Sequence, residues 1–96
     1  MSINLNTFRI FLSVYELQSM TQAAAALHLT QSGVSQHVKA LEQELGFPLF
    51  ERVGKKLFPT AKASVLYRKG RRGLAAIEAA VREVRRRFPN KVILAW

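Results

Sequence analysis

A long apolar stripe in the last third of the chain limits the folds open to it. Apolar or small side chains recur at alternating spacings of four and three along residues 63–88, which predicts one amphipathic helix over about 60–88. At 1.5 Å per residue this helix is about 40 Å long, more than the small domain before it can cover. We therefore expect part of the stripe to pair with a second copy of the chain. The candidate dimerisation residues are Tyr67, Leu74, Ile77, Val81, Val84 and Phe88.

Two glycines fall within this predicted helix. Gly70 lies on the apolar stripe and Gly73 lies beside it. Each weakens a helix by roughly 1 kcal/mol relative to alanine, or it allows another element to cross very closely. The sequence leaves both readings open.

Capping and breaking signals divide the residues before this helix. Apolar spacing predicts a first helix that ends near Gln18, and Ser19 can cap a short second helix rich in alanine. Thr30 can cap a third helix, which Gly46 ends. Two helices joined by a short turn are typical of a helix-turn-helix, although many other helical corners share the pattern.

Apolar arms on either side of Gly54 predict a hairpin over residues 48–59. After a helix-turn-helix, such a hairpin is a wing, and it would present Arg52, Lys55 and Lys56 at its tip. The predicted fold class is therefore mainly α.

The chain is expected to divide into three parts. We predict a winged helix-turn-helix over residues 1–59 and a long linker and dimerisation helix over residues 60–88. The apolar segment 89–96 is typical of the first strand of a further, truncated domain, or else of a tail that packs across its own helix.

Composition removes most catalytic chemistry. All six acids are Glu, Asp and Cys are absent, and the imidazoles are His28 and His37. Without Asp or Cys, the chain has too few catalytic side chains for a hydrolase triad. The absence of Cys also excludes a disulfide and a thiolate zinc site. We predict no enzyme activity, no catalytic residues, no metal and no cofactor. His37 is expected to pack or to touch phosphate, and His28 is expected at the surface.

The net charge of +9 points to an anionic partner. Residues 61–96 hold ten Lys or Arg against Glu78 and Glu83. No apolar run approaches the roughly 20 residues of a membrane-spanning helix, and the N-terminus does not resemble a secretory signal. We therefore expect a cytoplasmic protein without a membrane contact.

The outer face of the third helix could read a nucleic acid. A helical wheel turns Val34, Val38 and Leu41 inward and leaves an opposite face that is polar and free of acids. Its amides, hydroxyls and ammonium group suit base edges and phosphates, although any surface helix has a polar face. The candidate DNA-binding residues are Thr30, Gln31, Ser32, Gly33, Ser35, Gln36, Lys39, Arg52, Lys55 and Lys56.

Residues 21–52, TQAAAALHLTQSGVSQHVKALEQELGFPLFER, closely resemble the winged helix-turn-helix of LysR-type transcriptional regulators, which are bacterial proteins. The family's motifs appear here as Ala23-Ala24 to Leu27, Thr30-Gln31, Val34-Ser35, Val38, Leu41-Glu42, Glu44-Leu45-Gly46 and Pro48-Leu49-Phe50-Arg52. One departure is Gln36, where the family often has arginine and where an amide favours adenine.

The resemblance, which covers about residues 3–88, implies a sequence-specific regulator that binds double-stranded DNA. It implies a homodimer on a pseudo-palindromic operator, with dimer against tetramer left open for the full-length protein. A small-molecule effector would act only through a further effector-binding domain, which would begin near Val92.

A protein of another class would also fit the charge pattern. The positive residues are concentrated in the last helix, away from the predicted reading face. A basic helical module that binds an acidic protein or an anionic surface would have this distribution. The alternative function is therefore an interaction module without sequence-specific binding.

Overall fold

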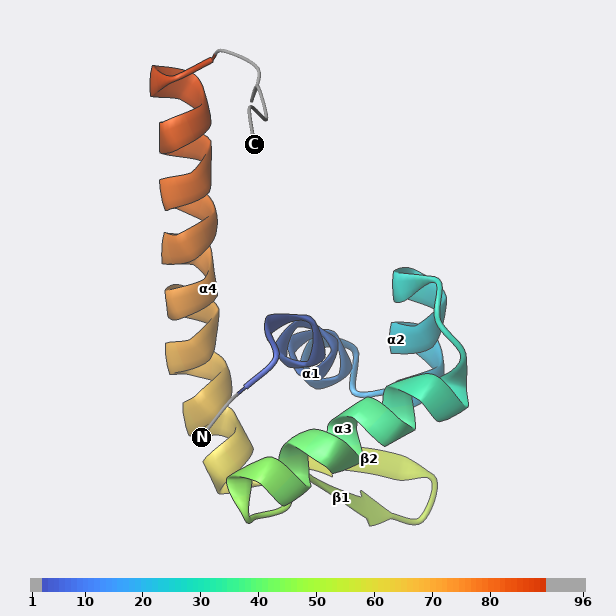
Figure 1. The fold of residues 1–96 in the computed structure, drawn as a ribbon. Coiled ribbons are helices and arrows are strands. Elements are labelled where there is room, and N and C mark those ends of the chain that lie inside the picture. The colour runs from blue at the N-terminus through green and yellow to red at the C-terminus, as the bar shows by residue number, and fades with distance from the viewer. Residues whose placement is uncertain (1–2, 90–96) are drawn as a thin grey trace.

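The computed structural model describes residues 3–89 as a winged helical head and one long helix. Figure 1 shows α1 between α4 and α2, with α3 and a hairpin along the lower edge and α4 running well past the head. The predicted mainly α fold is confirmed, while residues 90–96, where a further domain was expected to start, lie outside the described residues. The elements in chain order are α1 (Leu5–Leu17), α2 (Met20–Leu27), α3 (Gln31–Leu45), β1 (Phe50–Val53), β2 (Lys56–Pro59) and α4 (Ala61–Arg87).

Each helix begins at a polar side chain that accepts backbone N–H groups left free by the first turn. Ser19 Oγ accepts from the Gln22 amide at 3.0 Å, which confirms the predicted second helix start. The other caps are Asn4 on α1, Thr30 on α3 and Thr60 on α4. The α1–α2 and α2–α3 turns are short because Gln18 and His28, the latter exposed as expected, adopt left-handed conformations at the helix ends.

The wing is a two-stranded antiparallel hairpin, as predicted. Phe50 pairs with Pro59, and Val53 pairs with Lys56 next to the turn. Gly54 has φ of +62°, which glycine adopts without a steric penalty. The local pattern around Gly54 was therefore sufficient to place the turn.

Two clusters of buried side chains meet on α1. The first joins α1, α3, the α3–β1 loop and α4, and the second joins α1, α2, α3 and β2. Phe50, at the base of the wing, packs against both clusters. The first cluster comprises Phe8, Phe11, Leu12, Leu41, Leu49, Ala63 and Leu74, and the second Ile10, Val14, Ala23, Ala24, Val34, Val38 and Leu57.

The first half of the α4 stripe, next to the head, packs within its own chain, and this half includes two of the predicted dimerisation residues. Leu74 is 8% exposed and belongs to the first cluster. The Tyr67 ring stacks on Tyr15, with centroids 4.0 Å apart. These two side chains face α1 because α4 crosses α1 here, and the periodicity of the stripe does not show where that crossing ends.

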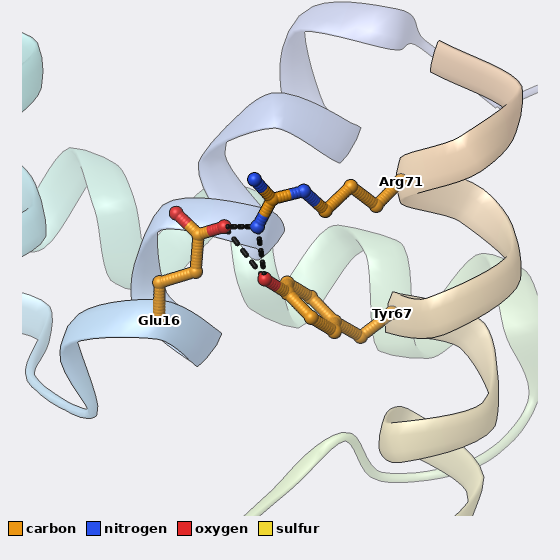
Figure 2. Close-up of polar contacts among 3 residues, drawn as sticks. All are labelled: Glu16, Tyr67 and Arg71. Carbon is orange, nitrogen blue, oxygen red and sulfur yellow. Dashed lines mark hydrogen bonds and ion pairs between the residues drawn. The ribbon is translucent and has the colours of Figure 1, made fainter. Parts of the chain in front are cut away.

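A polar cluster joins the same two helices at the surface (Figure 2). The Tyr67 hydroxyl donates to Glu16 Oε2 at 2.6 Å, and Arg71 Nη1 donates to the same Glu16 oxygen at 2.6 Å. Arg9 forms an ion pair with Glu78 at 2.9 Å further along α4. The hydrogen bond to Glu16, and secondly burial, raise the pKa of Tyr67 above its ordinary value of 10.0.

The two glycines of α4 have opposite surroundings, and we expect their alanine variants to have opposite effects. A Cβ at Gly70 would lie 2.1 Å from Phe8 Cζ, whereas one at Gly73 would meet no atom within 4 Å. Since the Phe8 ring is held in the core, Gly70→Ala should lower the free energy of unfolding by about 1–3 kcal/mol. Gly73→Ala should raise it by up to about 1 kcal/mol. Urea unfolding of both variants measures this, and equal effects would contradict the close crossing.

The raised pKa of Tyr67 predicts a loss of stability in alkaline solution. The protonated hydroxyl is favoured in the folded state, so its contribution is complete below pH 10 and is lost as pH rises through the folded-state pKa. Tyr67→Phe lacks this group. The free energy of unfolding, measured in urea between pH 8 and 11, should therefore fall less steeply for the variant, and parallel curves would show that the bond to Glu16 does not couple to folding.

Candidate nucleic-acid interface

The outer face of α3 is open to solvent over its first half. Gln31, Ser32, Gln36 and Lys39 are exposed and line one shallow hollow together with the half-buried Ser35. The opposite side chains of α3, Val34, Val38 and Leu41, are buried in the core. The helical wheel therefore placed both faces correctly, and we call the exposed set of five the reading face.

The start of α3 depends on Thr30 and Gly33. The Thr30 Oγ1 atom accepts from the Gly33 amide at 3.0 Å and lies 3.4 Å from Ser32 Oγ. A Cβ at Gly33 would lie 2.9 Å from the same Thr30 oxygen. Any larger residue at position 33 must displace the capping hydroxyl. Both residues therefore serve the geometry of the helix start, whatever else they touch.

The wing brings two of its three predicted cations towards the reading face. Arg52 pairs with Leu57, and cross-strand partners share one face of a hairpin. Since Leu57 is buried against the head, Arg52 lies on the face towards the helices. Arg52 and Lys55 line a polar hollow with Gln31 and residues 18–21.

Lys56 lies on the other face of the hairpin. It pairs with Val53, and these two positions alternate with Arg52 and Leu57 along the strands. Both Lys56 and Val53 are exposed. The structure thus separates Lys56 from the Arg52 and Lys55 pair, which the sequence alone did not indicate.

Sequence reasoning missed two contacts, one beside the reading face and one near the C-terminal end of α3. Residues 18–21, at the start of α2, share a hollow with the wing, and no motif in the sequence signals this contact. Glu42 Oε2 accepts a hydrogen bond from the Leu49 amide at 2.7 Å and is half-buried. An acid one turn before a helix end, followed by a loop with unpaired amides, is the signal that could have pointed to it.

His37, on the flank of α3, makes a contact within the chain. His37 Nδ1 lies 3.0 Å from Thr7 Oγ1, so this half-buried ring packs against α1 as one of the two expectations had it. Within residues 3–89, no group of His, Asp or Glu could hold a metal ion. In the same part of the chain, no helix is long and apolar enough to cross a membrane.

The upper half of the α4 stripe remains uncovered. Ile77, Val81, Val84 and Phe88 are exposed, and the Phe88 side chain reaches 70%. Three of them line a shallow apolar hollow with Ala80 and the stem of Arg85. We call these four residues the free stripe.

Comparison with known proteins gives one family for this architecture. Residues 5–64, more than half of the chain, match the description bacterial regulatory helix-turn-helix protein, lysR family. The chain is 43% identical over 65 residues to the HTH-type transcriptional regulator DgcR of a Pseudoalteromonas species, covering 68% of this chain and 22% of that protein. It is 38% identical over 84 residues to a RuBisCO operon transcriptional regulator of Allochromatium vinosum, covering 88% of this chain and 26% of that protein.

Solved structures agree with this assignment. The BenM DNA-binding domain in its complex with catB site 1 DNA superposes with a TM-score of 0.86 and 29% identity, over 93% of this chain and all of that one. The CbnR DNA-binding domain in complex with DNA has a TM-score of 0.81 and 28% identity, covering 86% of this chain and 95% of that one. The chain spans about a quarter of the length of the curated relatives that it matches. By fold, motifs and family match, it belongs to the lysR family of bacterial regulatory helix-turn-helix proteins, a family of regulators and not of enzymes.

Proposed function

We propose that this chain is the DNA-binding part of a transcriptional regulator and that it recognises a specific duplex sequence with α3 in the major groove. The observation that carries the proposal is the open reading face, where Gln31, Ser32, Ser35, Gln36 and Lys39 line one acid-free hollow. Related domains of this family have been crystallised with DNA, which supports the same partner here.

Each group of the interface has a distinct chemical role in this proposal. Gln36 can form a bidentate pair with adenine, and Lys39 can reach a guanine or a phosphate. The hydroxyls of Ser32 and Ser35 can bond to either base edges or phosphates. Because α3 enters with its N-terminal half, its helix dipole also favours phosphate there.

The wing would supply contacts to the flanking backbone or the minor groove. Arg52 and Lys55 face the hollow beside Gln31, so they can lie against the same duplex as the reading face. Contacts of this kind provide affinity with little sequence preference, while base contacts provide discrimination. Lys56, on the opposite face of the hairpin, would contribute less.

The free stripe would join two copies of the chain. Two heads joined in this way, each with its reading face, would match a pseudo-palindromic operator. Its half-sites would be about one turn of the DNA helix, or a multiple of it, apart. Tyr67 and Leu74 would support the interface from within each chain and would not contact the partner. A tetramer, and a small-molecule effector acting through a further domain, would require segments beyond the described residues. The expected location is the cytoplasm.

Base reading can be tested at Gln36, with Gln43 as a matched control on the same face of α3. Gln36→Ala should cost about 1–3 kcal/mol on a duplex selected from random sequences and little on unselected DNA. Gln43→Ala, near the helix end that carries Glu42 and Glu44, should change neither. Equilibrium binding at fixed salt measures both. Indifference of the reading face to substitution would favour the interaction module that binds acidic surfaces through the arginines of α4.

Dimerisation can be tested with two valines of equal exposure on α4. Val81 lies on the free stripe and Val65 lies off it, and each is 44% exposed. Val81→Lys should make the protein monomeric at concentrations where the wild type sediments as a dimer, because like charges would meet at the interface. Val65→Lys should remain dimeric. A monomeric wild type, or equal dissociation of both variants, would contradict the proposed interface.

A further inference from the structure

Leu49 connects three parts of the fold through its backbone. Its amide donates to Glu42 Oε2 of α3 at 2.7 Å. Its carbonyl accepts from the Thr60 amide at 2.9 Å and from the Thr60 hydroxyl at 3.3 Å. Its side chain is fully buried in the first core cluster. Leu49, the residue just before β1, is therefore held by α3 through its amide and by the start of α4 through its carbonyl.

The Thr60 hydroxyl has a second task at the same point. Its one proton is shared between the Leu49 carbonyl and the Pro48 carbonyl, the latter at 2.9 Å, while its oxygen accepts from the Ala63 amide as the cap of α4. The carbonyls of Pro48 and Leu49 are thus held by several hydrogen bonds. The Leu49 N–H, in contrast, is held by a single acceptor, the Glu42 carboxylate. A hydrogen bond to a charged acceptor is about twice as strong as one between neutral groups.

The hydrogen bond between Glu42 and Leu49 lies where a small change can alter the direction of the wing. Arg52 follows Leu49 by three residues, and a strand advances about 3.3 Å per residue. The backbone of Arg52 is therefore about 10 Å from that of Leu49 along the strand. A change of strand direction at Leu49 therefore displaces Arg52 and Lys55 more than it displaces the base of the wing. The same change leaves α3, which is anchored by Val34, Val38 and Leu41, in place.

We propose that Glu42 is a positioning residue for DNA binding: without touching nucleic acid, its carboxylate orients the wing so that Arg52 and the reading face meet one duplex. This inference rests on the proposed function. It also explains how an acidic residue is accommodated on α3. The carboxylate points to the loop before β1, where it accepts the hydrogen bond from the Leu49 amide.

The first experiment is made without DNA on the whole 96-residue chain. Backbone amide exchange, followed by NMR, is compared for wild type, Glu42→Ala and Glu42→Gln. The Leu49 amide should exchange at least about tenfold faster in Glu42→Ala, with the increase confined to the wing, because a buried amide loses its acceptor. Glu42→Gln should exchange more slowly than Glu42→Ala and faster than wild type, since its neutral amide oxygen can accept the same bond but more weakly. An unchanged Leu49 amide in Glu42→Ala would overturn the proposal whatever the chain binds.

The second experiment measures binding to the selected duplex in two mutant cycles. Arg52→Ala should lower affinity several-fold in the wild-type background and little in the Glu42→Ala background, while Gln36→Ala should cost the same in both. Glu51→Gln, which removes an equal charge from the wing, corrects for the gain expected from deleting any acid near DNA. If Arg52→Ala costs as much in both backgrounds, Glu42 does not act through the wing. A wild type that selects no duplex would refute the proposed function, and the exchange result would still decide the role of the Leu49 bond.

Discussion

The structure depends on the burial of α1 from three sides. Phe8, Ile10, Phe11, Leu12 and Val14 point into both core clusters, so this one helix contacts α2, α3 and α4. Burial of large apolar side chains is the main favourable contribution to folding in a domain of this size. The long helix crosses the head closely at Gly70, because the Phe8 ring occupies the space that any side chain there would need.

Features that depend on neighbouring residues were predictable from the sequence. The caps at Ser19 and Thr30 are local hydrogen bonds, and α2 and α3 begin where these caps predicted. Gly54 placed the wing turn, because a positive φ is a property of one residue. The inward and outward faces of α3 followed from 3.6 residues per turn alone.

Features that depend on the crossing of distant elements were not predictable. The stripe on α4 reads as one pattern, yet Tyr67 and Leu74 pack against α1, while the stripe residues Ile77, Val81, Val84 and Phe88 are exposed. Similarly, Arg52, Lys55 and Lys56 are neighbours in sequence, but strand register puts Lys56 on the other face. The two readings of Gly70 could be separated only by the position of Phe8.

The α4 helix carries both the contact to the head and the free stripe without a break. The number of residues between these two parts therefore sets the angle between them around the helix axis. Each residue of an α-helix turns the next by about 100° and advances it by 1.5 Å. An insertion of one residue between Leu74 and Ile77 would rotate the free stripe by about 100° around the axis, and in the proposed dimer the two heads would no longer address the same side of the duplex. An insertion of seven residues, close to two full turns, would restore the azimuth and move each head by about 10.5 Å. In the proposed dimer, the length and helical phase of α4 would therefore set the spacing and the relative orientation of the two half-sites.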